Sequence, residues 1–297
     1  MSQCVLCGRR CKAQRAPVEL RSSESRAEGE QAGCSRDHAT GVCRTGDRAK
    51  VSSFGPHFGE EPPLVGRRGS GTIFFAGCNL KCIYCQNYDI AHLDRGWEIT
   101  DEELSRIMLR LQELGCHNIN LVSPTHVVPN ILAAVRLAAV KGLKVPIVYN
   151  TGGYDSLETL EILDGVVDIY MPDMKYGEPG PAEEFSMAPD YPEVNFRAVK
   201  EMHRQVGDLV TDKHGVAVRG LLVRHLVLPG DMAGTEKVME FIAAHISKDT
   251  YVNIMDQYWP CYKARRHPVI GRRISGREYR DALDIARRAG LTRVQVL

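Results

Sequence analysis

Three cysteines within eight residues constrain this chain more than any other feature, in the stretch Cys78-Asn-Leu-Lys-Cys82-Ile-Tyr-Cys85. Three thiolates can hold three irons of a four-iron, four-sulfur cluster and leave the fourth iron open. A structural zinc ion needs a fourth protein ligand, which a second Cys-x-x-Cys pair would usually supply. No such pair follows nearby. The pattern indicates an open-iron cluster, and the alternative is a zinc knuckle completed by a distant group such as His92.

The surroundings of these cysteines point to a known family. An apolar run precedes them at residues 72–77, and the aromatic Tyr84 stands just before the last one. Together with the C-x3-C-x2-C spacing, this resembles the signature of radical S-adenosylmethionine (SAM) enzymes. The resemblance implies an oxidoreductase in which Cys78, Cys82 and Cys85 are the catalytic ligands of a 4Fe-4S cluster. It also implies reductive cleavage of SAM at the open iron, giving a deoxyadenosyl radical that abstracts hydrogen from a substrate.

Composition limits the partners and the compartment. Thirty-eight basic and 37 acidic residues leave a net charge near zero, so the chain as a whole offers little attraction to nucleic acid or to an anionic membrane. No apolar run approaches the roughly 18 residues of a membrane helix, and the N-terminus has no apolar signal core. Ten cysteines in a protein of this kind favour metal ligation over disulfides. We expect a cytoplasmic enzyme.

The chain divides into two parts. Residues 1–68 hold five cysteines and few periodic apolar runs, which predicts an irregular, Cys-rich, metal-binding appendage. Residues 69–297 alternate strand-like and helical runs, the pattern of a parallel sheet covered by helices. We expect a partial (β/α)6 TIM-type barrel, an α/β fold; a flat doubly wound sheet is the alternative. The candidate strands are 72–77, 118–122, 145–150, 166–171, 220–228 and 251–255.

Three helices have recognisable starts. Thr100 with Glu103, and Ser275 with Glu278, form the Ser/Thr-x-x-Glu pattern of a capping box ahead of an apolar face. A third helix is expected over residues 128–141, with a proline in its first turn.

Polar residues follow the predicted strands. In a barrel the loops at the carboxyl ends of the strands form the active site, so these residues should converge. The candidates at or after the strand ends are Ser123, Thr125, Asn150, Thr151, Asp173 and Lys175, and Arg224 lies within the fifth strand. We expect all seven to contact the cofactor, and for Asp173, Lys175 and Arg224 the family resemblance implies it.

Residues 69–228 resemble one branch of the family more closely, the activating enzymes of glycyl radical proteins, such as pyruvate formate-lyase activating enzyme, and their activase-like relatives. The segment around the three cysteines matches that branch, including Asn87. The resemblance implies that Tyr84 lies near the adenine of SAM and that Arg224 contacts the cofactor. It implies that Asp173 and Lys175 lie beside the methionyl carboxylate and an associated cation.

Two departures from the branch concern the substrate. The Gly-Gly-Glu-Pro motif that meets the methionyl ammonium is replaced by Ser123-Pro-Thr-His126, so an oxygen of Ser123 or Thr125, or a backbone carbonyl, must accept those hydrogens. The late Pro-Tyr-His segment of the branch is also missing.

A second set of cysteines lies near the N-terminus. Cys4, Cys7 and Cys11 precede a long gap and then Cys43, and four thiolates suffice for either zinc or a complete second iron-sulfur cluster. Residues 21–38 resemble an insertion, and Cys34 within them is expected to be dispensable.

The leading hypothesis is an activase that plants a glycyl radical on a partner protein and receives electrons from a low-potential donor of the flavodoxin or ferredoxin type. A second enzyme hypothesis is radical modification of a peptide, a small molecule or RNA, and the near-neutral charge makes nucleic acid the least favoured of these. A third hypothesis, from another class, is an iron-sulfur electron-transfer or sensor protein. That class predicts a fully ligated cluster, which three cysteines do not provide.

Overall fold

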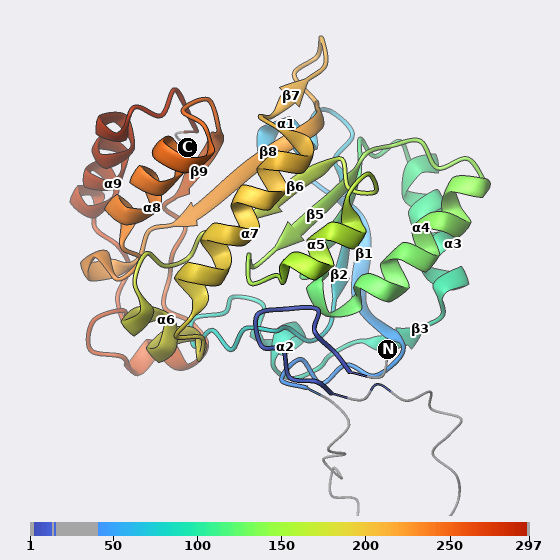
Figure 1. Ribbon diagram of the computed structural model, residues 1–297, viewed down its shortest axis with the longest axis horizontal. Helices are drawn as coiled ribbons and strands as arrows, with labels where there is room; N and C mark the ends of the chain where they lie inside the picture. The colour runs from blue at the N-terminus through green and yellow to red at the C-terminus, as the bar shows by residue number, and fades with distance from the viewer. Residues whose placement is uncertain (1–2, 14, 16–40, 296–297) are drawn as a thin grey trace, which may run out of the picture.

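A computed structural model describes the protein over residues 3–13, 15 and 41–295 (Figure 1). Its framework is a large sheet in which seven described strands run parallel. They are β2 (Ser70–Phe75), β4 (Ile119–Val122), β5 (Ile147–Thr151), β6 (Ile169–Pro172), β8 (Ala217–Leu226), β9 (Tyr251–Met255) and β10 (Arg293–Gln295). The six predicted strands are confirmed, and β10 is an addition.

The order of the strands decides between the two predicted architectures. The parallel strands follow one another as β10-β9-β8-β6-β5-β4-β2, in sequence order and without the reversal that defines a doubly wound sheet. Right-handed crossovers in one direction place the connecting helices on one face. Since the two ends of the strand path do not pair within the described residues, the sheet is open. The predicted partial barrel is confirmed, and its carboxyl-terminal rim brings the strand ends together.

Among the described helices that cover the sheet, those starting at Asp101, Leu157 and Gly276 begin at a side-chain cap. In both predicted capping boxes the serine or threonine accepts from the backbone N–H of the glutamate, and the glutamate accepts in return. The helix from residue 128 is also confirmed. The longer helices are α3 (Asp101–Glu113), α4 (Val128–Val140), α7 (Tyr191–Val206) and α9 (Gly276–Ala289); the shorter ones are α1 (Pro62–Val65), α2 (Tyr88–Ala91), α5 (Leu157–Leu163), α6 (Pro179–Ser186) and α8 (Thr235–Phe241).

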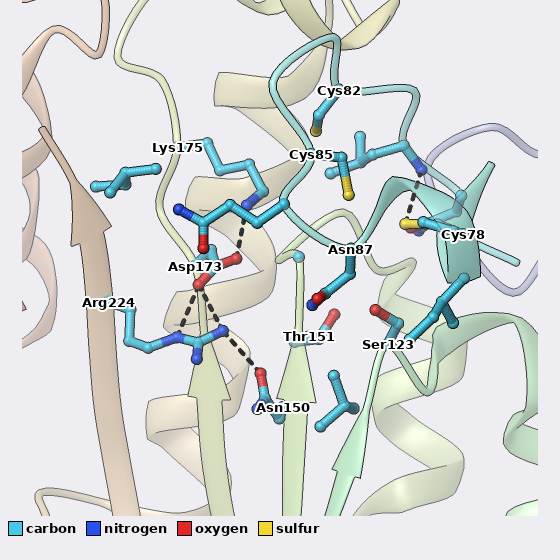
Figure 2. A pocket seen from close by; sticks show the side chains of 18 of the residues that line it. Cys78, Cys82, Cys85, Asn87, Ser123, Asn150, Thr151, Asp173, Lys175 and Arg224 are labelled. Atoms are coloured by element: carbon cyan, nitrogen blue, oxygen red, sulfur yellow. Dashed lines mark hydrogen bonds and ion pairs between the residues drawn. The ribbon is translucent and has the colours of Figure 1, made fainter. Parts of the chain in front are cut away.

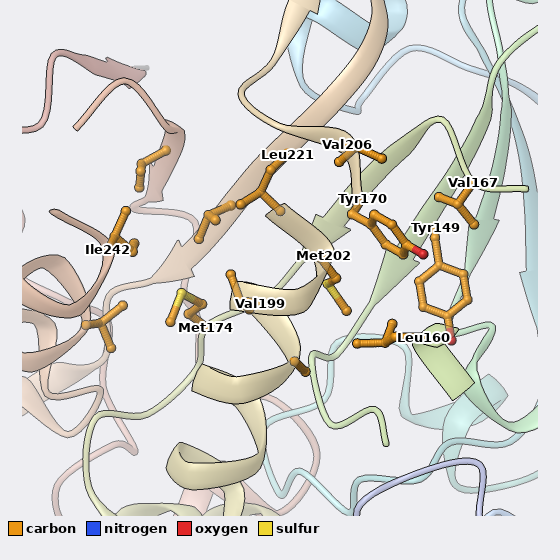
Figure 3. Close-up of a cluster of buried hydrophobic side chains, with 14 of the residues drawn as sticks. Tyr149, Leu160, Val167, Tyr170, Met174, Val199, Met202, Val206, Leu221 and Ile242 are labelled. Carbon is orange, nitrogen blue, oxygen red and sulfur yellow. The ribbon is translucent and has the colours of Figure 1, made fainter. Parts of the chain in front are cut away.

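The main core lies between the sheet and its helices (Figure 3). Tyr149 and Tyr170 project from neighbouring strands, and their rings meet edge to face at 5.7 Å. Leu160 of α5 and Met202 of α7 belong to the same cluster and are fully buried. Full burial of one such side chain stabilises the fold by about 1.5 to 3 kcal/mol relative to exposure. The core therefore fixes α5 and α7 against the strands that carry the rim.

Two further strands extend the sheet beyond β2. β1 (Ala49–His57) pairs antiparallel with β2, and β3 (Trp97–Ile99) pairs antiparallel with β1. β1 and α1 precede residue 69 yet belong to the same sheet assembly as the strands after it; the predicted division of the chain at that residue stays a prediction. None of the described helices is both long and apolar enough to cross a membrane.

Candidate active site

A cavity of about 260 Å³ opens at the carboxyl-terminal rim of the sheet (Figure 2). Its wall draws residues from the ends of β2, β4, β5, β6, β8 and β9 and from the loop after β2. All twelve residues predicted for the main site line it. They are Cys78, Cys82, Tyr84, Cys85, Asn87, Ser123, Thr125, Asn150, Thr151, Asp173, Lys175 and Arg224.

The three cysteines sit on a loop between β2 and α2, residues 76–87, which we call the cluster loop. Backbone hydrogen bonds fix it on two sides. Ile83 donates its N–H to the carbonyl of Phe185 on α6 at 2.8 Å, and its own carbonyl accepts from the N–H groups of Lys263 and Ala264 at 3.0 and 2.9 Å. A loop held in this way presents its thiols from a fixed backbone.

The thiols fit a cluster better than a single ion. Cys82 is 8% exposed, and burial raises the pKa of Cys78 and of Cys85. No other described cysteine lines the cavity, so the three thiols are one ligand short of a tetrahedral structural zinc site. A cluster binds each thiolate through a different iron, so its ligands do not meet at one point. Three thiol donors beside a cavity of this size therefore suit a cluster with one iron left open.

Tyr84 is anchored behind the cluster loop. Its hydroxyl lies 2.7 Å from that of Tyr176, which lies 2.7 Å from the hydroxyl of Ser186, and Ser186 is 3.0 Å from the sulfur of Cys82. Only 5% of Tyr84 is exposed. The network fixes the ring at the cavity wall, where one face of a planar ligand can pack against it.

A charged triad occupies the side of the cavity formed by β6 and β8. Asp173 accepts from Nζ of Lys175 at 2.6 Å and from Nε of Arg224 at 2.8 Å, and Arg224 also donates to the side-chain oxygen of Asn150 at 2.8 Å (Figure 2). Burial alone would raise the pKa of Asp173, but the cations of Arg224 and Lys175 outweigh it and hold that pKa below its ordinary value. Asp173 is therefore an anion at neutral pH, flanked by two cations that can also meet a ligand carboxylate.

Asp155 is a buried carboxylate that the sequence analysis did not predict. It lies beneath the wall of the cavity opposite the charged triad. Asp155 accepts hydrogen bonds from the hydroxyls of Thr125 and Thr151, both at 2.7 Å, and from Tyr149 at 2.9 Å. Burial raises the pKa of Asp155, while hydrogen bonds from Thr151, Thr125 and Tyr149 lower it in part. Hydroxyls that donate to a carboxylate can still accept through their oxygen lone pairs. Thr151 already accepts from the N–H of Gly153 at 3.1 Å, which leaves it one further lone pair. Thr125 and Thr151 line the cavity, so an ammonium group is a suitable donor for them.

The backbone of this side is tightly constrained. Ser123 follows β4 in the left-handed region at φ 57°, which is uncommon for a residue with a side chain. Gly153, at φ 73°, has no room for a side chain, since a Cβ would lie 2.3 Å from the carbonyl oxygen of Asp173. The strand ends thus approach one another as closely as their backbones allow.

Glu61 is a second residue that the sequence did not reveal. It is 5% exposed, and one of its carboxylate oxygens lies 3.9 Å from Nε of Arg224 and accepts from Asn253 at 3.1 Å. Glu61 precedes α1, inside the segment predicted as an appendage, and no motif marks it. It adds a second negative charge to the surroundings of Arg224.

Comparison with known proteins identifies the fold and the class of enzyme. Residues 72–242 match the family model of the Radical SAM superfamily. The chain belongs to this superfamily. The protein is accordingly an enzyme, and the cofactors of its superfamily are a 4Fe-4S cluster and SAM. The resemblance seen in the sequence is confirmed.

Individual proteins similar to this radical SAM protein differ in how much of it they match. It is 32% identical over 266 residues to the uncharacterized protein MJ0674 of Methanocaldococcus jannaschii, covering 86% of the chain and 72% of that protein. It is 42% identical to the pyruvate formate-lyase-activating enzyme of Clostridium pasteurianum over 57 residues, 19% of the chain and 24% of that enzyme. The FeFe-hydrogenase maturase HydG from Carboxydothermus hydrogenoformans shares the fold, with a TM-score of 0.50 at 12% identity; the match covers 72% of the chain and 49% of HydG.

The N-terminal thiols of this radical SAM protein form a separate group. Cys4, Cys7, Cys11 and Cys43 line a smaller cavity of their own, next to the cluster loop. Cys34 lies outside the described residues.

Proposed function

We propose that this enzyme cleaves SAM reductively at a 4Fe-4S cluster held by Cys78, Cys82 and Cys85, and uses the radical to abstract hydrogen from a glycyl radical protein. The observation that carries the proposal is the pairing of three thiols, without a fourth at the same cavity among the described residues, with the charged triad of Asp173, Lys175 and Arg224. Thiol donors suit iron, and the charged groups suit an amino acid ligand.

The side chains of the cavity have complementary roles in this proposal. When bound, the cluster supplies one electron for the cleavage of SAM. Lys175 and Arg224 orient the methionyl carboxylate, and Asp173 keeps both cations in place. The lone pairs of Thr125 and Thr151, with Ser123 beside them, accept hydrogens from the ammonium group.

Other residues hold the nucleoside and protect the radical. Tyr84 presents its ring to the adenine, and Asn87 and Asn150 offer amide groups at the wall of the cavity. The apolar part of the wall, which includes Leu226 and Met255, keeps water from the radical.

The choice of a protein substrate rests on the local match to an activating enzyme. That match covers 57 residues, so the substrate is the part of the proposal that needs its own experiment. The second candidate is radical modification of a peptide, small molecule or RNA at the same site. The electron-transfer or sensor hypothesis needs a fully ligated cluster, whereas a fourth cysteine is missing from the described wall of the cavity.

Enzymes of this superfamily need a reductant. We propose a flavodoxin or ferredoxin as the donor and a reducing, cytoplasmic location, in keeping with the free thiols of all nine described cysteines. Cys4, Cys7, Cys11 and Cys43 are proposed as a second metal site.

The substrate proposal is tested with the reconstituted, reduced enzyme, SAM and a purified candidate glycyl radical protein. We expect formation of 5′-deoxyadenosine together with an organic radical on the partner, and loss of that radical when the radical-bearing glycine of the partner is replaced by alanine. Cleavage of SAM without any radical on the partner would favour the second candidate. Replacing Cys78, Cys82 or Cys85 by alanine should abolish cleavage in either case.

A further inference from the structure

The four N-terminal thiols come from two short segments that fold against each other. Residues 4–13 close on themselves, since Cys4 donates its N–H to the carbonyl of Ala13 and accepts from the N–H of Lys12, both at 3.0 Å. The second segment turns at Gly41, whose carbonyl accepts from the N–H of Arg44 at 2.9 Å. Gly41 packs directly on Cys11: a Cβ there would lie 2.4 Å from the sulfur. The sequence gap between the cysteines is thus closed in space.

Three of the four thiols are buried, and all four are free. Cys4, Cys7 and Cys43 are 3%, 8% and 6% exposed, Cys11 is exposed, and none of the four forms a disulfide. No three described side chains already stand at the distances of ligands to one ion, so the thiols must turn toward a metal as it binds. Thiol rotation about a fixed backbone is a small movement.

The size of the cavity distinguishes the possible metals. The cavity that the four thiols help to line has a volume of about 10 Å³, whereas the main cavity has about 260 Å³. A space of roughly 10–15 Å³ holds one water-sized body, hence a single ion but not an eight-atom cluster. A tetrahedral site of four thiolates is typical of structural zinc. We propose that Cys4, Cys7, Cys11 and Cys43 bind one zinc ion that joins residues 4–13 to the segment around Cys43, beside the cluster loop.

The charges around this cavity suit four thiolates on a divalent ion, which carry a net double negative charge. Nη2 of Arg15 lies 3.6 Å from the sulfur of Cys43, and Arg9 also lines the cavity. Each guanidinium is held by carbonyl oxygens of the barrel side, that of His126 for Arg15 and that of Ser186 for Arg9. These cations offset the charge of the site without closing it to the ion.

Residues next to the proposed zinc site contact the cluster loop directly. Arg9 donates to the carbonyl of Asn79, the residue next to Cys78, at 3.0 Å, and Asn79 donates to the carbonyl of Tyr154 at 2.9 Å. At the start of the loop, Gly77 lies so close to Cys43 that a Cβ would be 2.6 Å from its carbonyl oxygen. This positioning role rests on the proposed function of the cluster loop, whereas the zinc site itself does not.

The test uses the full chain in which Cys78, Cys82 and Cys85 are all replaced by alanine, so that the main cluster cannot contribute. We expect one zinc per chain and no acid-labile sulfide. Further substitution Cys7→Ser should remove the zinc, and Cys11→Ser, at the exposed ligand, serves the same purpose if Cys7→Ser does not fold. Cys116→Ala, a buried thiol of the core remote from the cavity, is the matched control and should keep the zinc, as should Cys34→Ser.

Replacement of zinc by Co²⁺ in the same protein should give the absorption of a tetrahedral cobalt–thiolate site, weakened in Cys11→Ser. Iron with sulfide in place of zinc, no metal at all, or full zinc in both the Cys7 and Cys11 variants would overturn the proposal. With the three main cysteines intact, Cys11→Ser should reconstitute with less iron than Cys116→Ala. Equal iron contents would overturn the positioning role alone.

Discussion

At the scale of single residues, the polar residues at the strand ends lie where the sequence predicted them. The buried residues that contact them from below were not predicted. Asp173, Lys175 and Arg224 follow or end buried strands, and parallel strands deliver such residues to one rim. Asp155 and Glu61 gave no comparable signal, because each acts from beneath residues that line the cavity. Asp155 contacts Thr125, which lies 30 residues away in the sequence, and Glu61 lies near Arg224, which is 163 residues away. No local sequence pattern encodes such contacts.

The first residue-scale prediction concerns the charged triad. Asp173→Asn removes the anion that holds Lys175 and Arg224, and Arg224→Lys keeps the charge but loses the two-point contact to Asp173 and Asn150. A charge-assisted contact contributes about 1.5 to 3 kcal/mol, so the affinity for SAM should fall about ten-fold to over a hundred-fold. Calorimetric titration of SAM and iron analysis measure the two quantities separately. Iron content should not change.

Arg219→Lys, on the same strand as Arg224 but outside the cavity, is the matched control and should bind SAM normally. Normal affinity in both Asp173→Asn and Arg224→Lys would place the SAM site elsewhere.

The second residue-scale prediction concerns Asp155. With Asp155→Asn the amide nitrogen can no longer accept a hydrogen bond, so one of the hydroxyls of Thr125 and Thr151 must turn, and its lone pairs leave the cavity. Affinity for SAM should fall several-fold. Thr151→Val should do the same, whereas Thr151→Ser keeps the hydroxyl and should bind nearly normally. Equal affinities for the valine and serine variants would show that the hydroxyl has no part in binding.

At the scale of elements, the helices and strands with local signals were predictable and those fixed by tertiary contacts were not. The capping boxes define α3 and α9, and buried apolar runs define the six parallel strands. α7 was missed because polar Asn195 interrupts its apolar face; this buried side chain donates to the carbonyls of Gly153 and Asp173 at 2.9 and 3.0 Å. β1 and β3 were missed because antiparallel pairing at an edge is decided by the partner strand.

The element-scale prediction concerns the turn after β5. Gly153→Ala combines left-handed backbone strain with a clash, since the new Cβ would lie 2.2 Å from the amide nitrogen of Asn195. Gly165→Ala has the same strain at φ 78° but open space within 4 Å. Left-handed strain costs about 1–2 kcal/mol in both, and overpacking costs a further 1–3 kcal/mol or so in Gly153→Ala alone. In denaturant unfolding, the free energy of unfolding should therefore be clearly lower for Gly153→Ala than for Gly165→Ala. Equal free energies of unfolding would mean that α7 packs loosely on this turn.

At the scale of the whole molecule, sequential strand order is what makes the site. Seven parallel strands in chain order present their carboxyl ends to one rim, and the cluster loop, α6 and the N-terminal segment meet there. The class of fold was within reach of the sequence because each strand carries its own signal. The twelve cavity residues were within reach because the cysteine spacing, the polar strand ends and the family resemblance mark them. The close contact between the N-terminal segment and the cluster loop was not, because it depends on glycines whose neighbours are distant in sequence.

The central claim is that Cys78, Cys82 and Cys85 hold a cluster whose open iron meets SAM, and electron paramagnetic resonance tests it most directly. The enzyme is reconstituted anaerobically and reduced, and its spectrum is recorded with and without SAM, beside the Cys116→Ala protein as control. We expect a cluster signal that changes on addition of SAM in both proteins and is lost in Cys82→Ala. A cluster signal that stays unchanged at saturating SAM would contradict the account.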